Sequence, residues 1–191
     1  MDCLGSQLQA RCLCYVELIR VAFGFQGERH VGEELNALMR EGFYVFHDLP
    51  FDGFNIDHVI VGPPGVYAVE TKARRKMINE SNGKADYRVI FDGANLTFPH
   101  KTDNHGIEQA KRNADTLGSW LTSATGERVS VEPILTFPGW WIERTSRSRL
   151  HVVNPKEIRR IFPKVPANPL PEDKIRRITH QLEQKCRMRE L

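Results

Sequence analysis

A chain of 191 residues, 40% hydrophobic and 27% charged, is long enough for one domain with a full core and too apolar for a disordered protein. Its net charge of +3 permits a nucleic-acid partner without requiring one. Four cysteines (Cys3, Cys12, Cys14 and Cys186) form neither a CxxC pair nor a zinc spacing, which favours reduced thiols and a cytoplasmic location.

The first element in chain order is the apolar stretch from Cys12 to Phe25. Glu17 and Arg20 interrupt this stretch, and it is too short to span a membrane. It also lacks the small-residue cleavage site of a signal peptide. We expect an amphipathic helix without a transmembrane segment, and a helix that lies on a membrane surface is the alternative.

The elements that follow alternate between helical and strand patterns. A helix is expected over Gly27–Arg40, ended by Gly42, and a second over Ile107–Leu121, because apolar residues recur there at helical spacing. Strands are expected at Phe43–Leu49, Asp57–Gly62, Val66–Thr71, Asp86–Phe91, Asn95–Phe98, Val129–Phe137 and Leu150–Val153. A short helix over Pro155–Phe162, capped by Asn154, and a charged helix over Glu172–Met188 complete the chain. The order predicts a mixed α/β or α+β fold with one central sheet.

The segment NIDHVIVGPPGVYAVETK, residues 55–72, consists of two apolar runs around a Gly-Pro-Pro-Gly turn. A turn centred between Pro63 and Pro64 makes the numbers of paired residues sum to 127, so Asp57 falls opposite Glu70. Opposed side chains share one face with Cβ atoms about 4.5–5.5 Å apart, where two carboxylates repel each other unless a cation lies between them. The period of two places Lys72 on the same face. The alternative is that these acids only aid solubility and that Lys72 is their counter-ion.

This hairpin, preceded by GERHVGEELNALMREGFYVFHDLP, resembles the nuclease-related domain (NERD) family of the PD-(D/E)xK nuclease superfamily. The resemblance extends over about Gly27 to Leu121, and Ile56 stands where the superfamily usually has a proline. It implies a restriction-endonuclease-like core, a central mixed sheet flanked by helices. We expect this domain at residues 26–153, between helical extensions at 1–25 and 154–191.

The resemblance also implies a Mg²⁺- or Mn²⁺-dependent nuclease that acts on DNA. Glu33 is implied as a further acid on the first core helix, and Gln109 as a polar site residue on the later helix. For both, an ordinary exposed helix position is the alternative. The implied catalytic residues are Glu33, Asp57, Glu70, Lys72 and Gln109, and the implied metal ligands are Asp57, Glu70 and the backbone carbonyl of Thr71.

Clusters of cations follow the hairpin and recur later in the chain. Arg74, Arg75 and Lys76 are expected to neutralise DNA phosphates, unless they are simply solvated. Arginines near two tryptophans could extend that surface, although the tryptophans could equally pack in the core. These residues are Arg144, Arg147, Arg149, Trp140 and Trp141. A catalytically silent binding or interaction module is the alternative function, and a homo-oligomer is left open.

Overall fold

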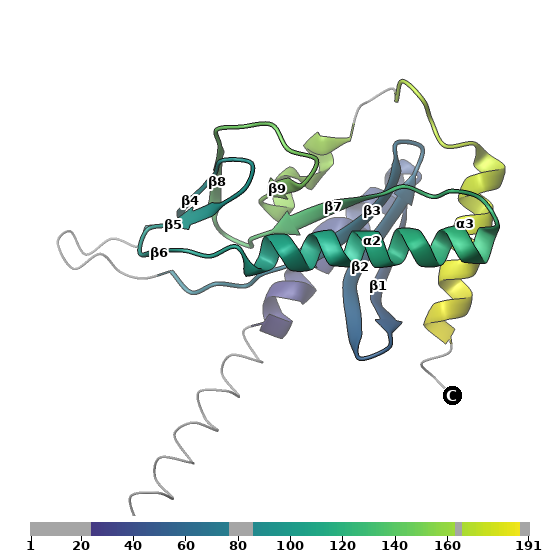
Figure 1. Cartoon of the computed structure of the whole chain (residues 1–191), viewed down its shortest axis with the longest axis horizontal. Coiled ribbons are helices and arrows are strands. Elements are labelled where there is room, and N and C mark those ends of the chain that lie inside the picture. Colours follow the sequence, from purple (N-terminus) through teal and green to yellow (C-terminus); the bar gives the residue numbers. More distant parts are fainter. Residues whose placement is uncertain (1–23, 77–85, 163–165, 188–191) are drawn as a thin grey trace, which may run out of the picture.

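A computed structural model describes residues 24–76, 86–162 and 166–187 of the chain (Figure 1). The expected N-terminal helix lies outside these ranges except for residues 24 and 25. Within the described ranges, no helix is both long enough and apolar enough to cross a membrane.

The central sheet has five strands in the order β1-β2-β3-β7-β9. Their bounds are Tyr44–Phe51 for β1, Phe54–Gly62 for β2, Gly65–Thr71 for β3, Val131–Thr136 for β7 and His151–Val153 for β9. Strand β2 runs antiparallel to both β1 and β3, whereas β3, β7 and β9 run parallel to one another. The sheet is therefore mixed, as predicted from the sequence.

The register of the β2–β3 hairpin is the predicted one. Gly62 pairs with Gly65 and His58 pairs with Val69, so the numbers of each pair sum to 127. Gly65 adopts a φ of +148°, a backbone conformation that favours glycine. The turn thus needs a glycine directly after the two prolines, and its length sets the pairing of every later residue in the hairpin.

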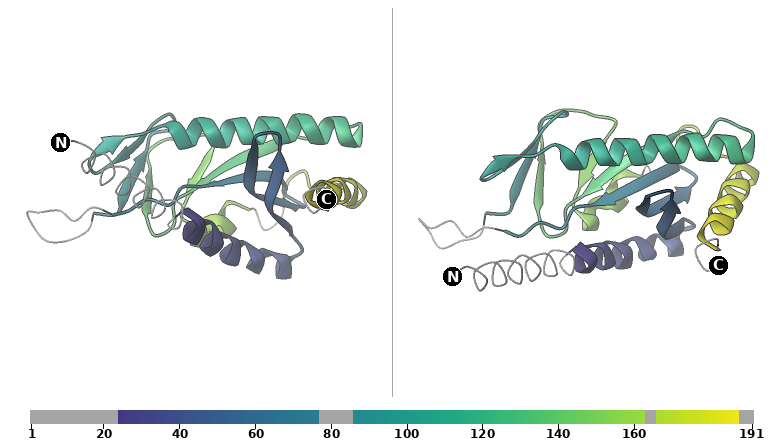
Figure 2. Two further views of the ribbon diagram at one scale, coloured as in Figure 1. Left: turned by 90° about the horizontal axis from the view of Figure 1, so that it is seen from below. Right: turned by 60° about the horizontal axis from the view of Figure 1, so that its bottom comes forward.

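Helices cover both faces of the central sheet (Figure 2). The first helix (residues 24–36) and the 3₁₀ segment η1 (Ala37–Glu41) lie on one face, and α2 (His105–Thr125) lies on the other. Alternation along β2 explains this: Val59 and Val61 belong to the core that contains Leu117 of α2, while Ile60 packs with Val31 of the first helix. Helix α3 (Glu172–Arg187) packs against β1 and α2. The predicted α/β architecture of a sheet flanked by helices is confirmed.

A second sheet extends the fold beyond the single sheet expected. Its order is β6-β5-β4-β8, with bounds Lys101–Thr102 for β6, Leu96–Phe98 for β5, Arg88–Phe91 for β4 and Trp141–Arg144 for β8. The predicted hairpin around Asp92 and Gly93 forms β4 and β5. Strand β8 was not predicted, because it has four residues and is recruited by parallel pairing with the distant β4. The second sheet is therefore built from a hairpin and a strand that lie far apart in the sequence.

The helix boundaries differ little from the predicted ones. Gly42, with a φ of +87°, ends the first helical region after η1. The segment η2 (Pro155–Ile161) begins where expected, and the Asn154 side chain accepts a hydrogen bond from the Lys156 backbone N–H. Helix α3 is described to Arg187, so the predicted last residue, Met188, lies outside the described residues.

Candidate active site

Asp57 and Glu70 lie near the open end of the β2–β3 hairpin, on the sheet face that α2 covers. The hairpin register, continued by one pair, places them opposite each other. The backbone N–H of Thr71 donates a hydrogen bond of 2.7 Å to Oδ2 of Asp57. The backbone N–H of Lys72 donates to the carbonyl of Thr136 at the end of β7. These two hydrogen bonds fix the end of β3 between β2 and β7.

Lys72 and two residues of α2 complete the cluster around Glu70, which is only 2% exposed. The Lys72 ammonium lies 2.7 Å from Oε1 of Glu70 and donates a 2.8 Å hydrogen bond to Oε1 of Gln109. The Asn113 side-chain amide donates a 2.8 Å hydrogen bond to Oε2 of Glu70. The structure thus brings Gln109 to the predicted residues. It adds Asn113, which the sequence analysis missed although its spacing of four from Gln109 places both on one helix face.

The structure does not bring Glu33 to this cluster. The Glu33 side chain is 67% exposed and lies 3.7 Å from Arg29 on the same helix. The carboxyl group of Glu28, on the same helix, does interact with charges of the site: burial, Asp48 and Glu70 raise its pKa, and Lys72 lowers it. The two glutamates are five residues apart and therefore about 140° apart around the helix.

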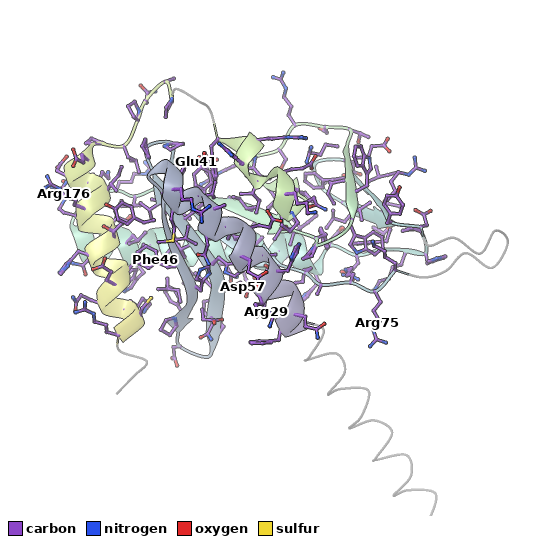
Figure 3. The ribbon with its side chains drawn as sticks, turned by 180° about the vertical axis from the view of Figure 1, so that it is seen from behind. Arg29, Glu41, Phe46, Asp57, Arg75 and Arg176 are labelled. Atoms are coloured by element: carbon purple, nitrogen blue, oxygen red, sulfur yellow. The ribbon has the colours of Figure 1, made fainter. Side chains whose placement is uncertain are left out.

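Gly27 brings the start of the first helix close to the end of β3. A Cβ atom built on Gly27 would lie 2.6 Å from the Cβ atom of Ala73, which directly follows Lys72. Only a glycine therefore lets the start of the first helix approach the end of β3 so closely. In Figure 3, seen from the side of the first helix, Asp57 lies in the sheet behind that helix. The Gly-Glu pair at 27–28 was the available sequence signal.

Both carboxyl groups of the hairpin hold their protons more tightly than free side chains do. Burial, followed by the charge of Glu70, raises the pKa of Asp57 to about 8, against the opposing effects of the Thr71 N–H and Lys72. Burial also raises the pKa of Glu70, even though the neighbouring Lys72 ammonium lowers it. Burial is again the largest cause of the raised pKa of Glu28. A cation placed between these groups would reverse the sign of their mutual interaction.

The oxygen donors at the site fit a hard divalent cation. Within the described residues, no group of three or more His, Cys, Asp or Glu side chains is arranged to hold a metal ion, as a structural zinc site would require. Mg²⁺ instead keeps several waters and is commonly held by one or two carboxylates together with substrate phosphates. Asp57 and Glu70 match that smaller requirement: burial raises both pKa values, and the charge of Glu70 raises that of Asp57 further.

The three cations after the hairpin have different surroundings. Arg74 lies 2.6 Å from Asp103, sits 4.5 Å over the ring of Phe98, and accepts a hydrogen bond from the Trp140 indole on its backbone carbonyl. It therefore ties the segment to the second sheet. Arg75 is exposed and points away from the body of the protein (Figure 3). Lys76 is also exposed, with its ammonium 5.5 Å over the ring of Tyr87.

The two tryptophans of the later basic region also differ. Trp140 is 5% exposed and belongs to the core between the sheets, so the core-packing alternative holds for it. Trp141 is 60% exposed. Arg149 donates a 2.9 Å hydrogen bond to the backbone carbonyl of Val131 and so has a structural contact.

Comparison with known proteins agrees with the resemblance expected from the sequence. The family described as NERD, nuclease-related domain, matches residues 23–138. No curated protein and no solved structure matches the chain. The matched range contains every side chain of the cluster around Asp57 and Glu70, including Glu28 and Asn113.

Proposed function

The chain belongs to the nuclease-related domain family, and from that premise we propose that it is a metal-dependent nuclease that hydrolyses DNA phosphodiester bonds. Membership supports a nuclease-related function and a nucleic-acid partner. Beyond membership, we propose chemistry of the PD-(D/E)xK type, a DNA substrate and a dependence on Mg²⁺. We also propose a cytoplasmic location. The observation that carries the nuclease proposal is the apposition of Asp57 and Glu70 with the Lys72 ammonium 2.7 Å from Glu70.

Asp57, Glu70 and the backbone carbonyl of Thr71 would hold Mg²⁺ or Mn²⁺. When bound, such a cation polarises the scissile phosphate and lowers the pKa of a bound water. The carboxylates must lose their protons to act as ligands, so the raised pKa values make occupancy increase with pH. The hydrogen bond from the Thr71 N–H to Asp57 keeps one oxygen of that carboxylate fixed.

Lys72 supplies positive charge for the transition state. Its ammonium contacts both Glu70 and Gln109, and these two contacts fix its position beside the end of β3. A fixed cation there stabilises charge that develops on the phosphate oxygens. Gln109 acts as the acceptor that orients Lys72.

Glu28 takes the role that the resemblance implied for Glu33. Its carboxyl interacts electrostatically with Glu70 and Lys72, and its raised pKa makes it a stronger base than a free glutamate. We assign Glu28 to the acceptance of a proton from the attacking water, either directly or through one further water.

The experiment that tests this function measures cleavage of supercoiled and linear DNA with Mg²⁺, with Mn²⁺ or with EDTA. Wild type should cleave only with a divalent cation, and Lys72→Ala should cleave about 10²–10³-fold more slowly, the usual loss for one group that stabilises transition-state charge. Lys72→Met is a second variant that keeps the side-chain stem, which packs near Gly106. Thermal melts with and without Mg²⁺ should show that both variants fold and still respond to the metal.

Two results would contradict the proposal in different ways. If wild type binds DNA but cleaves no supercoiled, linear, single-stranded or branched substrate with either metal, the protein is a silent binding module. If Lys72→Ala and Lys72→Met cleave as fast as wild type, the role given to Lys72 is wrong even though the protein is a nuclease.

A further inference from the structure

Positive charge is concentrated in residues 143–162, beyond the range that the family matches. This segment contains two acids, Glu143 and Glu157, and therefore has a net charge of +4, compared with +3 for the whole chain. Its six cations are Arg144, Arg147, Arg149, Lys156, Arg159 and Arg160. The rest of the chain thus has a slight negative net charge, so this segment is a strong source of attraction for a polyanion, in addition to the cations at residues 74–76.

A groove of about 700 Å³ lies within this segment, bounded by the end of β8, by β9 and by η2. We call it the β8–β9 groove. Its buried lining is apolar and includes Phe91, Leu150 and Val152. Its remaining lining is mostly polar and includes the guanidinium groups of Arg144, Arg147 and Arg160 and the hydroxyl groups of Thr145, Ser146 and Ser148. Guanidinium groups next to hydroxyl groups are the donors that proteins use to bind phosphate oxygens.

The cations of the groove are available to a ligand to different degrees. The Arg147 side chain is exposed and has no ion pair with any described residue. Arg160 is 80% exposed and lies 3.3 Å from Glu157, which also lies 3.8 Å from Arg144. Glu157 is the single carboxylate among the lining residues, so it faces two guanidinium groups and leaves an excess of positive charge. Arg144 also donates to the Val152 carbonyl, which gives it a structural role.

The groove and the candidate active site share one end of the central sheet. Thr71 of β3 pairs with Thr136 of β7, and Thr136 pairs in turn with Val153 of β9, which lines the groove. Adjacent strands are about 4.8 Å apart, so Val153 lies two strand spacings, or about 10 Å, from Thr71. A nucleic-acid strand at the active site can therefore continue across the same end of the sheet to the groove.

We propose that the β8–β9 groove binds the phosphodiester backbone of the nucleic acid on one side of the bond that the site cleaves. This proposal rests on the proposed function for its purpose, but the binding that it predicts does not require cleavage. Contacts made by arginine and hydroxyl groups to phosphates carry no sequence information. The groove should therefore contribute affinity that is independent of sequence and that falls steeply with salt.

The test measures binding of the full chain to a fluorescein-labelled duplex of about 20 base pairs and to the matching single strand, by anisotropy in EDTA at several salt concentrations. Arg147→Gln should reduce the slope of log K against log salt by about 0.9 for the duplex and 0.7 for the single strand. Arg176→Gln is the matched control, because Arg176 is exposed on α3 at the other end of the molecule (Figure 3). The control removes the same charge and should leave the slope unchanged.

A second variant is expected to gain affinity, which misfolding could not produce. Glu157→Gln removes the one carboxylate of the groove and frees Arg144 and Arg160 for phosphates. It should therefore tighten binding to the duplex and make the salt dependence steeper.

The outcomes separate this proposal from the proposed function. If Arg147→Gln and Glu157→Gln bind DNA with the same affinity and salt slope as Arg176→Gln, the groove proposal is wrong, whether or not the protein cleaves DNA. If the groove variants behave as expected but wild type cleaves no DNA with Mg²⁺ or Mn²⁺, the groove stands and the nuclease proposal fails. Co-sedimentation of the same proteins with phosphatidylserine vesicles is the second arm of the test. If Arg147→Gln weakens binding to these vesicles but not to DNA, the ligand is a lipid surface and the proposal is overturned.

Discussion

Two glutamates of the first helix show how strongly the surroundings of a single residue decide its role. Glu28 lies where the helix approaches Ala73, and its carboxyl interacts with Glu70 and Lys72. Glu33 is 67% exposed and pairs with Arg29 at 3.7 Å, as an ordinary surface glutamate does. The two side chains have the same chemistry, so any difference between their variants reports position alone.

We expect Glu28→Gln to reduce metal-dependent DNA cleavage about 10²–10⁴-fold, the usual loss for a general base. Glu33→Gln is the matched control and should cleave within about twofold of wild type, because surface substitutions rarely change the fold. Initial rates at saturating DNA with Mg²⁺ measure both effects. Equal rates for the two variants would show that Glu28 takes no part in the reaction.

At the scale of elements, α2 supports the end of β3 through a single helix face. Gln109 and Asn113 are four residues apart, and they contact Lys72 and Glu70 respectively. Ile107, Ala110 and Ala114 of the same helix are buried against the sheets, so the polar pair is fixed by apolar packing on either side. The helix therefore sets the position of Glu70 in β3 and of Lys72, which directly follows that strand.

Asn113→Ala should lower the stability of the metal-free protein. It leaves one oxygen of the buried Glu70 without its amide donor, which costs about 1–3 kcal/mol. For a chain of this size, each kcal/mol corresponds to about 2–4 °C in Tm. Thermal melts in EDTA measure the loss, with Asp115→Ala, at an exposed position of α2, as the control. A loss no larger than that of the control would mean that the Asn113 hydrogen bond contributes nothing.

The segment that follows β3 joins the two sheets through Arg74. Arg74→Ala removes the contacts with Asp103 and Phe98 and should cost about 1–3 kcal/mol. Lys76→Ala, two residues further on, should change the free energy of unfolding by less than about 0.5 kcal/mol. It should instead weaken DNA binding and reduce its salt dependence. Urea denaturation measures the first effect and anisotropy titration the second. An Arg74→Ala variant that is as stable as wild type but binds DNA more weakly would show that Arg74 binds DNA and has no structural role.

For the whole molecule, stability depends on pH through buried groups whose pKa values shift in opposite directions. Burial lowers the pKa of His58 to about 3, so the neutral histidine favours the folded state at neutral pH, and this contribution is lost as pH falls below about 6.5. The pKa of Asp57 is raised to about 8, so the folded state binds more protons than the unfolded state between about pH 4 and pH 8. Between about pH 6.5 and pH 8, the raised pKa values of the carboxyl groups dominate among the described residues, and the stability of the metal-free protein should fall as pH rises.

We therefore expect Asp57→Asn to raise Tm in EDTA at pH 8.5, by about 2–8 °C if ~1–2 kcal/mol of unfavourable burial and repulsion is removed. The variant should also flatten the fall in Tm between pH 6.5 and pH 8.5. Asp52→Asn, in the exposed turn between β1 and β2, is the control and should have little effect. A Tm for Asp57→Asn below that of wild type across this range would show that the folded state favours the ionised Asp57.

Mg²⁺ should oppose the same loss of stability in wild type. At ten times its Kd, a metal that binds only the folded state adds about 1.4 kcal/mol, and its effect should be larger at pH 8.5 than at pH 6 because protons compete for the ligands. Asp57→Asn should blunt the response. Calorimetric melts with millimolar Mg²⁺ or Mn²⁺ measure it, and a wild-type Tm that responds to neither metal would rule out a preformed site.

Much of the central site follows from local sequence. The turn length and the period of two set the hairpin register, which places Asp57, Glu70 and Lys72 on one face without knowledge of the rest of the fold. The apolar spacing of α2 likewise predicts a helix that includes Gln109. These features depend only on residues close together in the chain, and the structure has the predicted register and helix.

Tertiary structure alone decided which other side chains join them. Asn113 meets Glu70 across 43 positions, and the Trp140 indole meets the Arg74 carbonyl across 66. The close approach of Gly27 to Ala73, which brings the start of the first helix to the end of β3, also depends on packing between distant segments. The second sheet required β8 to pair with a strand about 50 residues earlier. Local periodicity tells which face of an element a side chain occupies, but packing between distant segments determines what that face meets.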